Sequence, residues 1–130
     1  MIRNTAVTVC GPLNVNKLGV TYVHEHLMVK PQLPDEYYIP YTLDDEAAST
    51  EETRSFSAAG GETLVEMTPI NYGRNVKAYQ RIAQATGVHV ICCTGFHKQL
   101  FMPPWFGDKT DGELYDILMD EVTNGLDDTE

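Results

Sequence analysis

Two histidines separated by one residue are the part of this sequence best suited to chemistry. His24 and His26 end the stretch Gly19–Leu27, whose apolar and β-branched residues predict a buried strand. Residues i and i+2 of a strand point to the same side, so both imidazoles should project together while Glu25 faces away. Imidazole nitrogens bind Zn²⁺ at about 2.0–2.1 Å, so the spacing suits a shared metal. The alternative is two strand histidines that hydrogen-bond to backbone carbonyls.

The position of the histidine pair favours the metal interpretation. The pair lies at the carboxyl end of an apolar strand, directly before the loop Lys30–Tyr41. The carboxyl ends of strands are where binding sites form in α/β proteins. The three prolines of this loop forbid a continuous helix, and its three tyrosines indicate that it is ordered.

The rest of the chain is predicted to alternate strands with helices. The expected elements are a hairpin that starts with the strand Thr5–Cys10, the strand of His24, a helix over Asp44–Ala59, a strand over Thr63–Thr68, a helix over Asn75–Ala85, a strand over Val88–Thr94, and a helix after a capping box formed by Thr110 and Glu113. This alternation implies right-handed crossovers and a parallel sheet. The carboxyl ends of the strands then share one face, which collects His24, His26, Glu66, Phe96 and His97, with Arg74 and Lys98 close by.

The length and net charge of the chain exclude some classes of binding partner. At 130 residues the chain is one domain at most, and 9 basic against 19 acidic residues give a net charge of -10. Such acidity argues against nucleic acid or an anionic membrane as a partner. The chain has no apolar run of about 18 residues, and its first residues lack the order of a signal peptide, which predicts a cytoplasmic protein.

The three cysteines do not form a disulfide framework. Their number is odd, and Cys92 and Cys93 are adjacent. We interpret these two and Cys10 as small buried residues, with a thiolate ligand as the alternative. A redox or metal-transfer role for the adjacent pair fits poorly with a position inside the sheet. His89 lies near the start of its strand and is expected to be structural, because it is at the wrong end to meet His24.

Five motifs in order resemble the first part of the phosphotriesterase family within the amidohydrolase superfamily, which includes the phosphotriesterase-like lactonases. They are Gly19-x-Thr21-x-x-His24-Glu25-His26-Leu27, the stretch Gly60–Thr68, Gly73-Arg74-Asn75, Thr94-Gly95 and the ending Gly125–Thr129. Each is weak alone, and together at this spacing they are fairly specific. The match runs from about Thr8 to the last residue.

The resemblance implies a (β/α)₈ TIM barrel with two divalent metals, commonly zinc, that hydrolyses a small-molecule ester, lactone or phosphoester through a metal-bound hydroxide. His24 and His26 would be ligands of the more buried metal. Glu66 falls where the family often has an aspartate, so its role stays open. His97 takes the place of an aromatic residue that faces the metals and substrate, and Phe96 beside it is a second predicted substrate contact.

Residues 1–130 would form a single partial domain, the N-terminal portion of such a barrel, with about three β/α units and a short hairpin. A complete barrel takes about 250 residues, and the remaining ligands and catalytic residues would lie beyond residue 130. We therefore expect weak zinc binding and no turnover from this chain alone. The alternative is a non-catalytic module that forms a homo-oligomer through its open sheet edge.

Substrate class follows from the same resemblance. Lactones, including phosphorylated sugar lactones, are favoured over organophosphates. Arg74, Lys98 and His97 could meet a polar or anionic substrate. The alternative is that these basic residues are solvated surface groups.

Overall fold

A β-hairpin precedes a three-stranded parallel sheet in the computed structural model, which describes residues 4–31, 42–127 and 129. The elements in order are β1 (Thr5–Thr8), β2 (Gly11–Asn14), η1 (Val15–Lys17), β3 (Thr21–Glu25), α1 (Glu46–Ala58), β4 (Thr63–Glu66), η4 (Ile70–Tyr72), α2 (Val76–Thr86), β5 (His89–Cys92), η5 (Gln99–Phe101), η6 (Pro104–Asp108) and α3 (Asp111–Asn124). Most of the predicted loop Lys30–Tyr41 lies outside the described residues.

The sheet has the order β3-β4-β5, and both pairings are parallel, as the alternating pattern predicted. β4 is the central strand, so a residue such as Glu66 is held by neighbours on both sides. Glu66 is in register with Glu25 of β3 and with Cys92 of β5. The carboxyl ends of the three strands therefore lie at one end of the sheet.

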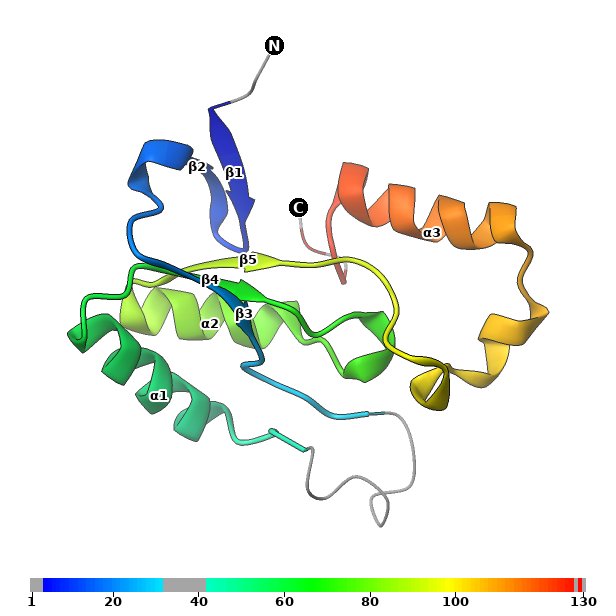
Figure 1. Ribbon diagram of the computed structural model, residues 1–130, viewed down its shortest axis with the longest axis horizontal. Coiled ribbons are helices and arrows are strands. Elements are labelled where there is room, and N and C mark those ends of the chain that lie inside the picture. The colour runs from blue at the N-terminus through cyan, green and yellow to red at the C-terminus, as the bar shows by residue number, and fades with distance from the viewer. Residues whose placement is uncertain (1–3, 32–41, 128, 130) are drawn as a thin grey trace.

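Helices α1 and α2 lie next to each other on one side of the sheet (Figure 1). α2 begins where the Asn75 side chain accepts a hydrogen bond from the Ala78 N–H, and it ends at Gly87 in the left-handed conformation. Its apolar face supplies much of the core. The buried cluster consists of Val9, Leu27, Met28, Leu64, Val76, Ala78, Tyr79, Ile82, Ala83, Val88 and Val90.

The hairpin packs against β5 (Figure 1). The Val9 N–H donates to the Val90 carbonyl at 2.9 Å, and the Gln80 amide donates to the Val9 carbonyl at 2.9 Å. The turn of the hairpin exposes Cys10, so the prediction of a buried residue there is wrong. A turn places its side chains in solvent because no second layer covers it. Cys92 is partly buried, as expected for a small core residue.

Helix α3 has the predicted Thr110/Glu113 capping box, yet none of its described residues is buried. Arg74 joins this helix to the rest of the fold: its side chain is 1% exposed and pairs with Glu121 and Asp127, and the Thr94 hydroxyl also donates to Glu121. The prediction that Arg74 could meet a substrate, and the alternative that it is a solvated surface group, are both wrong. The carboxylates that occupy Arg74 come from 47 and 53 residues further along the chain.

Gly73 permits a close approach between η4 and the segment after β3, next to the carboxyl end of the sheet. Its φ is +87°, and an added Cβ would lie 2.4 Å from the Lys30 backbone. The Lys30 N–H donates to the Tyr72 carbonyl at 3.2 Å, so the segment after β3 is held against η4. No described helix is both long enough and apolar enough to cross a membrane.

Candidate metal centre

The rings of His24 and His26 lie together at the carboxyl end of β3. Their centroids are 5.4 Å apart, with the ring planes at 70°. Two imidazoles that bind one tetrahedral Zn²⁺ at about 2.0–2.1 Å have centroids on the order of 5 Å apart. The pair therefore fits two ligand positions of one cation. The structure does not support the backbone-carbonyl alternative for His26, because Nδ1 of its ring contacts a side-chain hydroxyl instead, that of Thr68.

A bulge in β3 changes which side chains of this strand point to the same side as the histidines. Tyr22 pairs with Leu64 and Glu25 pairs with Glu66, so β3 has one residue more than β4 between these points. Such a bulge re-aims the side chains next to it. Strict alternation would place Tyr22 on the side of the histidines, but Tyr22 lies 6.5 Å from the Phe56 ring of α1.

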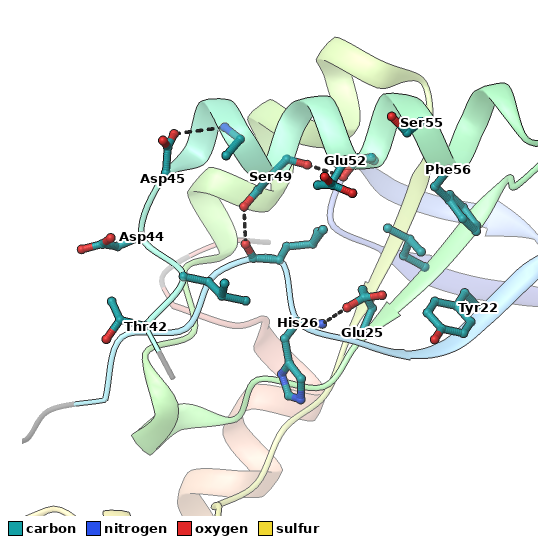
Figure 2. Close-up of a pocket in the computed structure, with 15 residues that line it drawn as sticks. Tyr22, Glu25, His26, Thr42, Asp44, Asp45, Ser49, Glu52, Ser55 and Phe56 are labelled. Atoms are coloured by element: carbon teal, nitrogen blue, oxygen red, sulfur yellow. Dashed lines mark hydrogen bonds between the residues drawn. The ribbon is translucent and has the colours of Figure 1, made fainter. Parts of the chain in front are cut away.

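Glu25 points away from the histidine rings, as predicted. Figure 2 shows Glu25 directed toward α1 and the ring of His26 directed to the other side of the chain. A cavity of about 550 Å³ separates α1 from β3 on the Glu25 side. Glu25 also accepts the His26 N–H at 2.8 Å, which fixes the backbone where the chain leaves the strand. His26 also borders this cavity, whereas His24 is not among the residues that line it.

The segment after His26 is held firmly in place. The Ser49 hydroxyl of α1 donates to the Leu27 carbonyl at 2.6 Å, as Figure 2 shows. The buried Tyr79 hydroxyl donates to the Met28 carbonyl at 3.2 Å. Two helices thus fix the backbone directly after the histidine pair.

Thr68 and Glu66 lie behind His26. The Thr68 hydroxyl is 2.9 Å from Nδ1 of His26 and 2.6 Å from Oε1 of Glu66. Glu66 Oε1 is 3.8 Å from the same Nδ1, too far for a direct hydrogen bond, so Thr68 connects the two groups. Both are fully buried, with Glu66 1% and Thr68 0% exposed.

The electrostatics of this cluster favour uncharged groups. Burial lowers the pKa of His26, and the neighbouring His24 lowers it further. Burial also raises the pKa of Glu66, against the hydrogen bonds from Thr68. His26 is therefore neutral near pH 7, which is the form that binds metals.

An aromatic group continues from the histidine pair. The ring of Tyr72 is 6.0 Å from that of His26 and 4.5 Å from that of His97. His97 also packs on Phe101 at 5.0 Å, and burial lowers its pKa, with a further contribution from Lys98. The structure thus brings the predicted residue His97 near the histidine pair, with Tyr72 between them.

Phe96 has a different environment from its neighbour His97. Its ring packs on Trp105 at 5.9 Å and on Phe106 at 5.0 Å, within the segment that leads to α3. Lys98 stays exposed, with its ammonium 5.3 Å from the Phe101 ring centroid. Of the three basic residues considered for an anionic substrate, Lys98 is thus the one whose charge faces solvent.

Within residues 4–31, 42–127 and 129, no group of three or more histidine, cysteine or acidic residues could hold a metal. Among those residues, His24 and His26 are thus two candidate ligands without a third. Sequence reasoning missed Thr68 and Tyr72. Thr68 follows Glu66 by two residues at a strand end, which was a usable signal, whereas nothing local marks Tyr72.

Comparisons with known proteins agree with this architecture. The model of the phosphotriesterase family matches residues 4–130. The chain is 34% identical to a phospho-furanose lactonase from Mycoplasmopsis synoviae, over 98% of this chain and 38% of that protein. It is 29% identical to an N-acetyltaurine hydrolase from Danio rerio, over 99% of this chain and 45% of that protein.

A solved structure also resembles this chain over only part of its own length. The crystal structure of a lactonase from Listeria monocytogenes superimposes with a TM-score of 0.87 at 28% identity, covering 96% of this chain and 44% of that one. The chain thus spans less than half the length of these relatives. Its hairpin and three β/α units form the N-terminal portion of a TIM barrel, as predicted. Because the family model covers nearly the whole sequence, the chain belongs to the phosphotriesterase family.

Proposed function

We propose that this chain supplies the first two metal ligands, His24 and His26, of a metal-dependent hydrolase that acts on lactones. The observation that carries the proposal is the pair of imidazoles 5.4 Å apart in a chain that matches the phosphotriesterase family over residues 4–130. A divalent cation bound there, with zinc as our proposal, would lower the pKa of a water and polarise a carbonyl oxygen. A second metal and the remaining ligands would come from strands beyond these residues.

The protein groups around the pair suit this task. Thr68 hydrogen-bonds to Nδ1 at the edge of the His26 ring, and the Tyr72 ring lies 6.0 Å from the His26 ring between centroids. His97 and Phe101 extend the aromatic surface from Tyr72. We propose that this surface contacts the substrate through His97. Phe96, our second predicted contact, would act by supporting the same loop.

For the substrate we propose lactones, including phosphorylated sugar lactones. A relative named phospho-furanose lactonase supports this class, as does the named lactonase among solved structures. Lys98 is the exposed cation near the aromatic surface, which suits one anionic group. Arg74 does not contribute, because its guanidinium is already paired.

The proposal is tested by zinc binding to the 130-residue chain. Competition with a chromophoric zinc indicator should show weak binding, because catalytic zinc sites usually have about three protein ligands and the described part of this chain provides two. The His24→Asn variant should lose that binding. His89→Asn is the matched control, because His89 begins β5 at the opposite end of the sheet.

Equal zinc binding by the unchanged chain and His24→Asn would contradict the ligand assignment. We also expect no hydrolysis of lactones by the 130-residue chain, with or without added zinc. Turnover comparable to that of a full-length relative would show that the site is complete in this chain, against our proposal.

A second candidate function is a non-catalytic module that self-associates through β3. β3 pairs with β4 on one side, and Tyr22 and Val23 on it are 53% and 69% exposed. An edge strand with exposed apolar residues is a template for pairing with a second copy. Native mass measurement distinguishes this function: a stable oligomer that Val23→Lys dissociates would favour it, and a monomer would exclude it.

A further inference from the structure

Behind His26, a chain of hydrogen bonds runs into the core. His26 Nδ1 lies 2.9 Å from the Thr68 hydroxyl, which lies 2.6 Å from Glu66 Oε1. The backbone N–H of Thr68 also donates to Glu66 Oε1, at 3.0 Å. Thr68 therefore contacts the same carboxyl oxygen twice, while its hydroxyl also faces the histidine.

The two contacts to Glu66 set the direction of the hydrogen bonds. Oε1 accepts the Thr68 N–H, so it is the acceptor toward the hydroxyl as well. A threonine hydroxyl has a single hydrogen, and here that hydrogen is directed to Glu66. The hydroxyl oxygen then offers a lone pair to His26, and Nδ1 must carry a hydrogen to use it.

The direction of these hydrogen bonds does not depend on the charge of Glu66. Glu66 Oε2 is buried and, among the described residues, has no partner of normal hydrogen-bond geometry, although the Tyr79 hydroxyl interacts with this carboxyl. With the proton of a neutral Glu66 on Oε2, Oε1 stays the acceptor of both Thr68 donors. The direction of the hydrogen bonds is thus the same in the neutral and ionised forms.

The arrangement is also rigid. Thr68 is 0% exposed, so its hydroxyl has no access to bulk water as another partner. Glu66 is on the central strand, in register with both neighbouring strands. Side chains so enclosed keep a single arrangement.

We propose that Thr68, supported by Glu66, is a positioning residue that fixes His26 with hydrogen on Nδ1, leaving the Nε2 lone pair for a cation. This inference rests on the proposed function for its purpose, since a metal ligand needs an unprotonated nitrogen of fixed direction. The tautomer itself is a property of the metal-free chain. It can therefore be tested independently of any metal.

The experiment is long-range ¹H–¹⁵N correlation of the histidine rings in the metal-free 130-residue chain at a pH where His26 is neutral. A ring nitrogen that carries hydrogen and one that does not have well-separated ¹⁵N shifts. We expect His26 to carry hydrogen on Nδ1 in the unchanged chain and in Thr68→Ser, which keeps the hydroxyl. Thr68→Val has the same shape without the hydroxyl and should shift His26 toward the Nε2–H form.

The signals of His89 serve as an internal control, since this residue lies at the other end of the sheet and should be unchanged. Hydrogen on Nε2 in the unchanged chain would overturn the inference without any variant. An unaltered His26 tautomer in folded Thr68→Val would overturn it as well.

Zinc titration of the same three proteins separates this inference from the proposed function. We expect Thr68→Val to bind zinc about 10-fold to 100-fold more weakly and Thr68→Ser to retain the affinity. If the tautomer changes as expected but none of the proteins binds zinc, positioning by Thr68 stands and the proposed function fails. If zinc binds equally to all three, the inference fails and the proposed function stands.

Discussion

Replacing Arg74 by methionine should detach helix α3 while the rest of the fold persists. The Arg74 guanidinium donates to Glu121, to Asp127 and to the Cys93 carbonyl, so it joins α3 and the residues after it to the end of β5. Methionine keeps the aliphatic volume of the side chain and removes all of these bonds. α3 has no buried residue of its own that could replace them.

The expected magnitude follows from burial. Removing one partner of a buried ion pair costs about 3–5 kcal/mol, because the other charge is left without compensation. The Glu121 side chain is 12% exposed and that of Asp127 is 35% exposed, so solvent screens part of the loss. We therefore expect about 3 kcal/mol, which corresponds to roughly 100-fold in an opening equilibrium. A detached helix of this length is marginal in water, so it should unfold once released.

Hydrogen–deuterium exchange measures this change element by element. Amides of α3 should exchange up to about 100-fold faster in Arg74→Met, while those of α2, which belongs to the core, should change little. The matched control is Arg81→Met, which removes an arginine that is 57% exposed and paired with Glu46 on the surface. It should leave α3 unchanged. Unaltered exchange in α3 of Arg74→Met, or equal acceleration in α2 and α3, would refute this account.

Two further substitutions test the supports of the site. In Tyr79→Phe, a buried hydroxyl whose pKa is raised by burial is removed. Above about pH 10 the unfolded tyrosine loses its proton while the folded one keeps it. Urea unfolding should therefore show the wild-type free energy of unfolding fall by about 1.4 kcal/mol in total, relative to the variant, between about pH 9 and 11. A constant difference would contradict this. In Asn71→Leu, the bonds to the Phe101 carbonyl and from the His97 N–H are lost, at about 1–3 kcal/mol for each buried group left unpaired. Exchange of the His97 amide should accelerate, and the exposed Asn124→Leu should not reproduce it.

The pattern of strands and helices was predictable because its causes are local. Alternation of apolar residues marks each strand, and capping side chains mark the helix starts. α1 begins at Glu46 after Asp45 has capped it, within two residues of the predicted start at Asp44. The predicted strand Val88–Thr94 is observed as His89–Cys92. Because local spacing also orders the histidines, their proximity followed from the sequence.

What sequence reasoning missed depends on contacts between distant segments. The bulge in β3 exists only relative to β4, so alternation within β3 does not place Tyr22 correctly. Arg74 looked like a free cation because its carboxylate partners come from the far end of α3 and beyond. The fold of η4 places Tyr72 at the site, and no periodicity in its own segment predicts this position.

The candidate site has two halves that rest on different supports. The proposed metal-binding half, His24 and His26, is held from behind by Thr68 and the central strand. The proposed substrate-binding half, residues 97–101, is held by Asn71, which is 2% exposed and hydrogen-bonds to His97 and Phe101. The Tyr72 ring contacts both halves, because it lies 6.0 Å from His26 and 4.5 Å from His97. The Asn71→Leu substitution should therefore leave the His26 tautomer unchanged, and it can affect zinc affinity through the Tyr72 ring or through His97, which also lowers the pKa of His26. A double-mutant cycle between Asn71→Leu and Thr68→Val, read by zinc affinity, measures that coupling directly.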